Sequence, residues 1–179
     1  SAARMETMIQ AVLRLSRIEE RRMNPESIDM NGLVQGILES FAYRIRQEQI
    51  RVSVAPLPEI RADRFSMEQI FSNLISNAIH YLVPGRTGAL SIGAEYHPDE
   101  TVFHVQDNGR GIEPADMTRI FDIFQRAGGA DVPGEGMGLT YTRSLIRRHG
   151  GRIWCDSRPD GGSTFFFSVA TDLEFNPHD

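Results

Sequence analysis

A row of polar, uncharged side chains follows one edge of the apolar face of the helix predicted over residues 64–82. At 100° per residue, this row contains Ser66, Gln69, Asn73, Asn77 and His80. Asn73 and Asn77 are four residues apart, so their amide oxygens can reach one hard cation such as Mg²⁺, which prefers oxygen ligands. Asparagine is also common on helix surfaces, so the row alone leaves a ligand site and an ordinary surface equally open.

An acidic residue and two glycines follow the end of a predicted strand, at residues 107–112. Asp107 can accept a hydrogen bond from an exocyclic amino group such as that of adenine, and Gly109 and Gly111 would let the backbone approach a flat ring. The same Asp-Asn-Gly sequence is a common turn, so this motif alone is a weak indication of a nucleotide site.

A glycine-rich segment leads directly into a helix predicted over residues 139–149. Gly134, Gly136 and Gly138 alternate before it, and the free amides of a helix N-terminus bind phosphate. The spacing is that of neither a P-loop nor a Rossmann motif, and a flexible linker is the alternative interpretation. Residues 161–165 predict a tight hairpin, whose local pattern indicates no ligand role.

Helices and strands must position these motifs. The apolar heptad positions Met5, Met8, Val12 and Leu15 predict an N-terminal helix that needs a partner, and Pro25 ends it. The other expected elements are helices at 32–48, 64–82 (N-cap Asp63) and 139–149, a short helix from 114, an extended piece at 28–30, and strands at 50–54, 89–96, 101–106, 151–155 and 164–170.

Composition limits the class of protein. The chain has 179 residues and a formal net charge of -5, from 19 Lys+Arg against 24 Asp+Glu, which excludes a dedicated nucleic-acid binder. Cys155 is the single cysteine, so neither an intrachain disulfide nor a four-cysteine zinc site can form. No apolar run reaches the length of a membrane-spanning helix. We expect a cytoplasmic piece of a longer parent, which is itself compatible with a membrane anchor.

Five short motifs occur in an order and spacing that resemble those of a known family. Residues 73–81 resemble the N box, 107–111 the G1 box, 120–126 the F box, 134–139 the G2 box and 161–165 a final glycine box. Together they resemble the catalytic domain of bacterial sensor histidine kinases, in the GHKL superfamily shared with DNA gyrase, mismatch-repair ATPases and heat-shock chaperones. The ordered set is far more specific than any single motif.

This resemblance implies an α/β (α+β) two-layer sandwich of the GHKL ATPase type, with a mixed, mostly antiparallel sheet, helices on one face and an added coiled-coil-like helix at the N-terminus. It implies ATP and Mg²⁺ as cofactors, with Asn73 and Asn77 as metal ligands, Asp107 on adenine and the G2 loop as a lid over the phosphates. The residues that it places around ATP are Asn73, Asn77, His80, Tyr81, Asp107, Gly109, Gly111, Ile112, Phe121, Phe124, Arg126, Gly134, Gly136, Met137, Gly138, Leu139 and Thr164.

Residues 13–19 resemble the second helix of the family's dimerisation hairpin. The expected division is therefore a partial hairpin at 1–24, a catalytic domain at 25–172 and a tail at 173–179. None of the five histidines lies in a sequence resembling the acceptor motif, so the phosphorylated histidine, and any catalytic group beyond the ATP site, is expected outside this chain. The implied partners are the parent's hairpin, a response regulator receiver domain and a second copy in the full-length homodimer.

Two positions depart from the family's pattern. His80 stands where the N box usually has lysine, so a permanent charge near the phosphates becomes pH-dependent. Asn73 stands where hydrolysing relatives carry a glutamate that activates water, which favours phosphate transfer over hydrolysis. The expected function is transfer of the γ-phosphate of Mg-ATP to a histidine of the hairpin. The alternatives are an ATPase clamp, a degenerate nucleotide-binding or docking module, and a serine kinase of an anti-sigma pathway.

Overall fold

The computed structural model describes residues 2–122 and 138–172. The helices are α1 (Ala2–Glu20), α2 (Met30–Ser40), α3 (Ala42–Gln47), α4 (Arg64–His80) and α5 (Gly138–Arg148). The strands are β1 (Pro25–Asp29), β2 (Arg51–Val54), β3 (Glu59–Asp63), β4 (Ala89–Tyr96), β5 (Glu100–Asp107), β6 (Ile153–Ser157) and β7 (Ser163–Ala170). In these two ranges no helix combines the length and the apolar character needed to cross a membrane.

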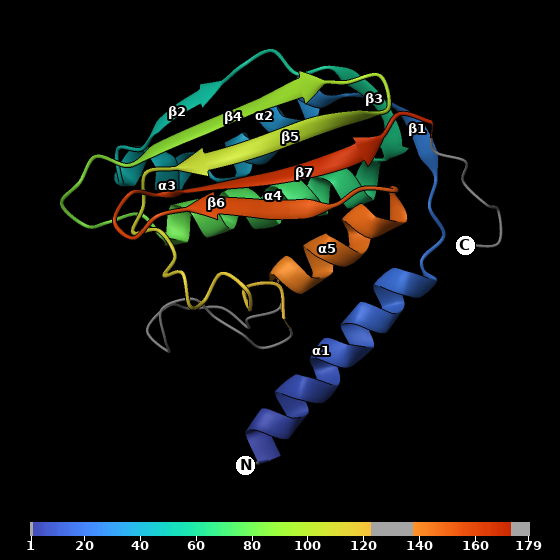
Figure 1. Ribbon diagram of the computed structural model, residues 1–179, viewed down its shortest axis with the longest axis horizontal. Coiled ribbons are helices and arrows are strands. Elements are labelled where there is room, and N and C mark those ends of the chain that lie inside the picture. The colour runs from blue at the N-terminus through green and yellow to red at the C-terminus, as the bar shows by residue number, and fades with distance from the viewer. Residues whose placement is uncertain (1, 123–137, 173–179) are drawn as a thin grey trace.

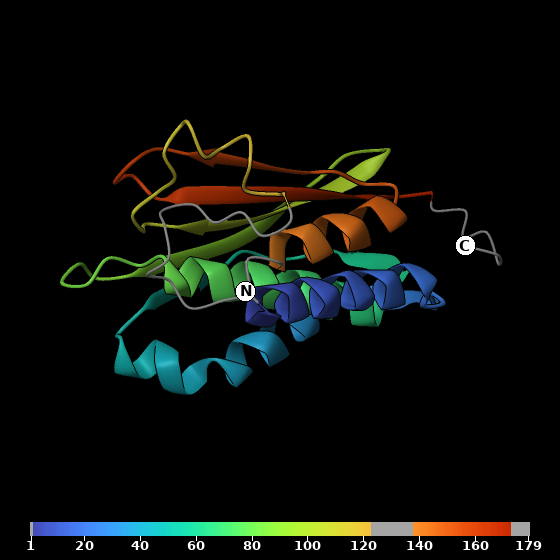
Figure 2. The ribbon, with the colours of Figure 1, turned by 90° about the horizontal axis from the view of Figure 1, so that it is seen from below.

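The larger sheet and the helices form two layers. Its five strands run in the order β2-β4-β5-β7-β6, with β2 parallel to β4 and every other pair antiparallel. A separate antiparallel pair joins β1 to β3. Helices α2, α4 and α5 lie on one face of the large sheet, and no helix of the described chain covers the other face (Figures 1 and 2). The predicted sandwich, with its mixed and mostly antiparallel sheet, is confirmed.

An aromatic cluster fixes α4 against the middle of the sheet. Phe71 of α4 packs edge-on against Phe103 of β5 at 5.5 Å between ring centroids, and against Phe167 of β7 at 5.2 Å. The two strand rings stack on each other at 5.1 Å. All three side chains are fully buried, and burying each contributes about 1.5–3 kcal/mol. The polar residues of α4 are thereby held at a fixed height above the ends of β5 and β7.

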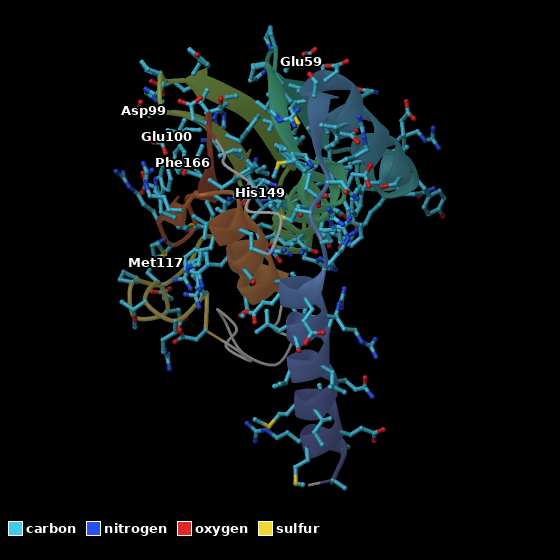
Figure 3. The ribbon with its side chains drawn as sticks, turned by 90° about the vertical axis from the view of Figure 1, so that its right-hand side faces the viewer. Glu59, Asp99, Glu100, Met117, His149 and Phe166 are labelled. Atoms are coloured by element: carbon cyan, nitrogen blue, oxygen red, sulfur yellow. The ribbon has the colours of Figure 1, made fainter. Side chains whose placement is uncertain are left out.

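Helix α1 extends away from the body and is attached along α5 (Figures 1 and 3). Ala11 is buried against Tyr141, whose hydroxyl donates a 3.0 Å hydrogen bond to the Ala11 carbonyl. Arg148 donates to the carbonyls of Ile18 and Arg21 at 2.7 and 2.6 Å. A guanidinium placed on the last carbonyls of a helix complements both its unpaired acceptors and its dipole. These contacts give α1 a defined direction relative to the rest of the chain.

The apolar heptad positions of α1 are left mostly uncovered. Met5, Met8 and Val12 are 64%, 44% and 55% exposed. Leu15 is half-buried against the contact with α5. An exposed apolar row at this spacing is typical of a helix that pairs with another helix.

Three elements differ from the sequence predictions. Strand β3 is not predicted from the sequence. Its exposed positions are charged, and it pairs with β1, which is distant in the sequence. The helix predicted over 32–48 is two helices, because the Phe41 amide bonds to the Leu38 carbonyl three residues back and turns the chain. The helix predicted from residue 114 is, up to residue 122, a series of turns closed by bonds such as Arg119 N–H to Asp116 O. The remaining predicted helices and strands are confirmed to within two residues at most ends.

Candidate functional site

Asp107 ends β5 on the helix-covered face of the sheet, and its side chain is only 6% exposed. One carboxylate oxygen accepts a 2.8 Å hydrogen bond from the Gly109 amide. Burial raises the pKa of Asp107 to about 6, although the backbone amides of Gly109 and Ser163 oppose the rise. No cation pairs with this carboxylate among the described ion pairs. A buried acceptor with spare capacity suits a neutral donor, such as the amino group of a heterocycle.

The glycines beside Asp107 are required by close backbone packing. A Cβ at Gly109 would lie 2.3 Å from the Tyr81 carbonyl oxygen at the end of α4. Gly111 has φ +71°, and its Cβ would lie 1.8 Å from the Arg158 carbonyl oxygen. The 107–112 turn is therefore wedged between α4 and the β6–β7 hairpin. Close backbone packing therefore accounts for glycine at these two positions, and the approach of a flat ring to them stays a prediction.

The two asparagines of α4 are both half-buried, and Asn73 lies beside the first turn of α5. The Asn73 amide nitrogen donates to the Thr142 hydroxyl at 3.2 Å and reaches the Gly138 carbonyl at 3.5 Å. Its Oδ1 accepts no hydrogen bond among the described residues, which leaves an oxygen available as a ligand. Among the described residues no group of three His, Cys, Asp or Glu side chains could hold a metal ion. Asn73 and Asn77 thus fit a hard cation that keeps several of its waters.

His80 is held by contacts with Ser76 and Arg44. Its Nδ1 lies 2.8 Å from the Ser76 carbonyl, which can only accept, so Nδ1 carries the proton. Its Nε2 then accepts from the Arg44 guanidinium of α3 at 3.4 Å. The ring therefore faces α3, and in this arrangement it does not extend the Asn73–Asn77 row as predicted. Ser66 also leaves the predicted row, because it is fully buried and bonds to Asp63 at the start of α4.

Several other predicted residues are buried in the core or packed against it. Ile112 is buried, and its amide donates to the Ser157 hydroxyl at 2.9 Å. Phe121 packs edge-on against Phe165 at 6.4 Å, and Leu139 packs against the core at the start of α5. Tyr81 caps the C-terminus of α4. The predicted residues that lie outside the described ranges are Phe124, Arg126, Gly134, Gly136 and Met137.

The register of β7 separates Thr164 from the site. Asp107 pairs with Ser163, and Gln106 pairs with Thr164. Because neighbouring residues of a strand point to opposite faces, Ser163 shares the face of Asp107 while Thr164 lies on the uncovered face. The prediction from the sequence includes neither Ser163 nor Thr142 as a site residue. Counting alternate positions back from the buried Phe165 would have found Ser163, and Thr142 is one helical turn after Gly138.

The fold and this site define the catalytic ATP-binding domain of the sensor histidine kinase class. The chain belongs to the family described as "Histidine kinase-, DNA gyrase B-, and HSP90-like ATPase", whose profile matches residues 62–173.

Comparison with known proteins places the chain among sensor kinases. It is 35% identical over 166 residues to the phytochrome-like protein Cph1 of Synechocystis sp., covering 92% of this chain and 22% of that protein. It is 32% identical to the adaptive-response sensory kinase SasA of Synechococcus elongatus, covering 92% and 44%. The catalytic domain of histidine kinase ThkA superposes with a TM-score of 0.72 at 27% identity, covering 83% of this chain and 99% of that one. The chain therefore spans only about a fifth of the length of its phytochrome-like relatives.

Proposed function

We propose that this chain binds Mg-ATP between α4, α5 and the 107–112 turn, and transfers the γ-phosphate to a histidine on the dimerisation hairpin of its parent protein. The observation that carries the proposal is the buried, cation-free carboxylate of Asp107 beside the half-buried amides of Asn73 and Asn77. In this arrangement Asp107 accepts from the adenine amino group and the two asparagines hold the metal. Ser163, rather than Thr164, completes the adenine end.

The residues of this chain act by positioning. The free amides at the N-terminus of α5 begin at Gly138, directly opposite Asn73, and favour the negative charge of the phosphates. Bound Mg²⁺ would bridge phosphate oxygens and offset the charge that develops as the γ-phosphate is transferred. Position 73 carries an amide, which cannot accept a proton from water at neutral pH, so the site lacks a general base there. Transfer to an incoming histidine is thereby favoured over hydrolysis.

The division of the chain follows from this role. We assign residues 1–24 to the second helix of the dimerisation hairpin, 25–172 to the catalytic domain and 173–179 to a tail. The exposed heptad row of α1 supports pairing with other hairpin helices in a full-length homodimer. A response regulator is the proposed next partner. Histidine kinase ThkA has been solved in complex with response regulator protein TrrA, and this chain superposes on that kinase with a TM-score of 0.75.

The test follows the γ-phosphate. The chain is mixed with Mg²⁺, ATP labelled at the γ-phosphate and the separately produced hairpin that precedes it in the parent. We expect acid-labile, base-stable label on the hairpin, which is lost with Asn77→Ala and Asp107→Asn. Asn24→Ala is the control for Asn77→Ala, because it removes an exposed asparagine. Gln106→Ala is the control for Asp107→Asn, because it changes the exposed neighbour of Asp107. Both control variants should transfer label normally.

Other outcomes would identify a different function. Rapid free phosphate with an unlabelled hairpin would indicate an ATPase clamp. No transfer and no release, with a folded hairpin and measurable nucleotide binding, would indicate a nucleotide-binding or docking module.

A further inference from the structure

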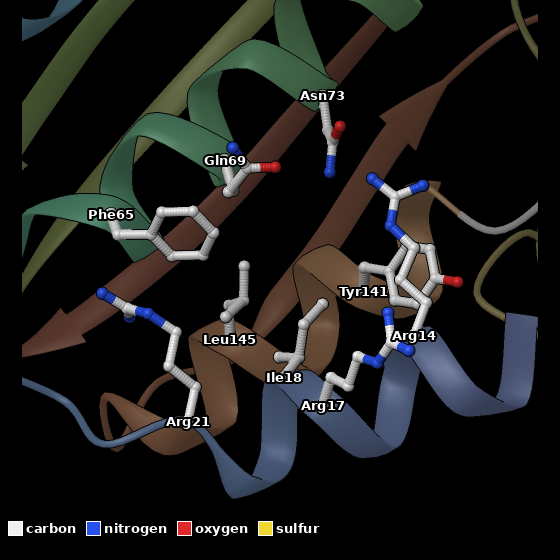
Figure 4. Close-up of a pocket in the computed structure, with 9 residues that line it drawn as sticks. All are labelled: Arg14, Arg17, Ile18, Arg21, Phe65, Gln69, Asn73, Tyr141 and Leu145. Carbon is white, nitrogen blue, oxygen red and sulfur yellow. The ribbon is translucent and has the colours of Figure 1, made fainter.

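A cavity of about 200 Å³ lies between α1, α4 and α5, next to the proposed ATP site (Figure 4). Its polar lining comes from two side chains of α4, one glutamine and one asparagine, and from one face of α1. The residues that line it include Arg14, Arg17, Arg21, Gln69, Asn73 and Tyr141.

Three arginines face this cavity from a single side of α1. Arg14, Arg17 and Arg21 are spaced three and four residues apart, which places them on one helical face. Figure 4 shows Arg14 directed toward Asn73 and Arg21 toward Phe65, while Arg17 runs along α1 toward the base of Arg14. Such a row, in a chain with net charge -5, concentrates positive charge at one place.

The three guanidinium groups differ in the contacts that they make with the rest of the protein. Arg21 forms a 2.7 Å ion pair with Asp63 and lies over the Phe65 ring. Arg14 lies 4.8 Å above the centroid of Tyr141. Arg17 forms no ion pair within residues 2–122 and 138–172. None of the residues lining the cavity is acidic, so Arg14 and Arg17 have no carboxylate within it.

The position of the row is fixed by the attachment of α1. The Tyr141 hydroxyl bonds to the Ala11 carbonyl, and Arg148 bonds to the carbonyls of Ile18 and Arg21, so α1 is held on both sides of Arg14 and Arg17. Two guanidinium groups that extend from this fixed helix, with no carboxylate in the cavity, favour a phosphoryl anion, which guanidinium binds through paired N–H donors.

Asn73 belongs both to this cavity and to the proposed ATP site. Its amide nitrogen reaches the Gly138 carbonyl at the N-terminus of α5, and the same side chain lines the cavity. Asn73 lies eight residues, about 12 Å of helix, before Tyr81, which marks the adenine end of α4. A nucleotide with its adenine at Asp107 therefore runs its phosphate chain toward Asn73 and the arginine row.

We propose that Arg14 and Arg17 of α1 bind the terminal phosphate of the nucleotide, so that the dimerisation helix completes the ATP site of its own catalytic domain. This inference rests on the proposed function. It adds a second element, α1, to the groups that distinguish ATP from ADP. Docking of α1 and occupation of the γ-phosphate position then favour each other.

The test compares two nucleotides by calorimetry in the presence of Mg²⁺. One is ADP, and the other is an ATP analogue with an imido bridge between the β- and γ-phosphates, which is not cleaved. Arg14→Gln and Arg17→Gln should each lower the preference for the analogue over ADP by about three- to tenfold, and should leave the affinity for ADP unchanged. Arg14→Lys should retain part of the preference. Arg4→Gln, at an exposed position of the same helix outside the cavity, is the matched control and should change neither affinity.

Inorganic phosphate distinguishes the two sources of the same anion. If phosphate binds to the ADP complex through Arg14 and Arg17, and the ATP analogue prevents this binding, the γ-phosphate position is supported. If phosphate binds equally well to the analogue complex, the cavity holds a separate anion and the inference is overturned. It is also overturned if both variants keep the full nucleotide preference. If the unmodified chain binds neither nucleotide, the proposed function fails, while titration with phosphate alone still shows whether the arginine row binds an anion.

Discussion

Two buried carboxylates lie near opposite ends of α4, and their pKa values are shifted in opposite directions. Asp63, at the N-terminus of α4, accepts from the Arg21 guanidinium at 2.7 Å, the Asn24 amide at 3.0 Å and both the amide and the hydroxyl of Ser66. Burial alone would raise the pKa of Asp63, but hydrogen bonds from Ser66, Arg21 and Asn24 outweigh burial and lower it. Asp107 has amide donors only, and burial raises its pKa to about 6.

The difference separates a carboxylate that stabilises the fold from one that is kept for a ligand. The hydrogen-bonding capacity of Asp63 is used by the protein itself, which joins the end of α1 to the start of α4. Asp107 is as deeply buried, at 6% exposure against 1%, yet its charge is poorly compensated. Sites that bind ligands commonly retain such uncompensated groups at a cost in stability.

Removing the compensated carboxylate should cost the most stability. Asp63→Ala leaves Arg21 and Ser66 without their shared acceptor, and we expect the free energy of unfolding to fall by about 2–4 kcal/mol. Urea denaturation at pH 7 measures it. Asp29→Ala is the matched control, because Asp29 also caps a helix but is exposed, and its loss should cost only about 0.5–1 kcal/mol. Equal losses for the two variants would contradict the special role of Asp63.

Neutralising the uncompensated carboxylate should stabilise the fold. The pKa of Asp107 in the folded chain, about 6, is above its ordinary value of 3.8, so the folded state binds more protons between these values and loses stability as the pH rises through them. At pH 7 the full cost is present. Asp107→Asn keeps an acceptor for Gly109 and should raise the free energy of unfolding by about 1–3 kcal/mol, while nucleotide binding falls at least about tenfold.

The same measurements on Asp156→Asn give the control for this substitution. Asp156 is exposed on the other face of the sheet, so neither stability nor binding should change. A loss of stability in Asp107→Asn would show that the Asp107 charge is compensated after all.

Acid should weaken recognition of adenine in particular. Below pH 6 the Asp107 carboxyl becomes protonated and can no longer accept freely from an amino group. The preference for ADP over the hypoxanthine nucleotide IDP, which has a carbonyl in place of the amino group, should fall by up to about tenfold between pH 7 and pH 5. Comparing the two nucleotides at each pH removes the titration of their phosphates. A preference that is constant over this range would separate adenine recognition from the ionisation of Asp107.

The smallest effect should come from loosening α1. Arg148→Gln removes two charge-assisted bonds to the last carbonyls of α1, so amides of residues 11–20 should exchange with solvent about fivefold faster. The core strands should keep their protection. Arg147→Gln, at the neighbouring exposed position, is the control and should exchange normally. Unchanged exchange in Arg148→Gln would mean that the contacts of Tyr141 and Arg21 are sufficient to hold the helix.

The predictable parts of the fold are those specified by local patterns. The alternation from Leu90 to Val105 gives both strands of the central hairpin, and Asp63 is recognisable as an N-cap from the residues after it. Strand β3 was not predictable in the same way, because its pairing with β1 joins segments thirty or more residues apart. The division of the 32–48 helix depends on a single backbone bond at Phe41, which leaves no periodic signal.

For the site, the sequence indicates the groups but not the directions in which they point. Asp107 is buried at the end of β5 and Asn73 lies beside the start of α5, while the roles proposed for these two residues and for Asn77 remain predictions. The spacing of α4 also puts His80 in the row, but Arg44 on a different helix draws its ring away. The sequence prediction includes Thr164, but the residue of β7 that shares the face of Asp107 is Ser163, one position earlier. A shift of one residue in a strand changes the face. Contacts between distant elements decided both cases.

The position of β7 has a consequence for the synthesis of this protein. β7 is the last strand of the described chain, yet it lies inside the sheet between β5 and β6, and Gly162 before it packs against the Asp107 carbonyl. At about 5–20 residues per second, the nascent chain completes β5 about 3–12 s before β7. During that interval the edge of β5, with Phe103, is open to pairing with other chains. A ribosome that slows between these strands would therefore prolong the period in which the chain is most prone to aggregate.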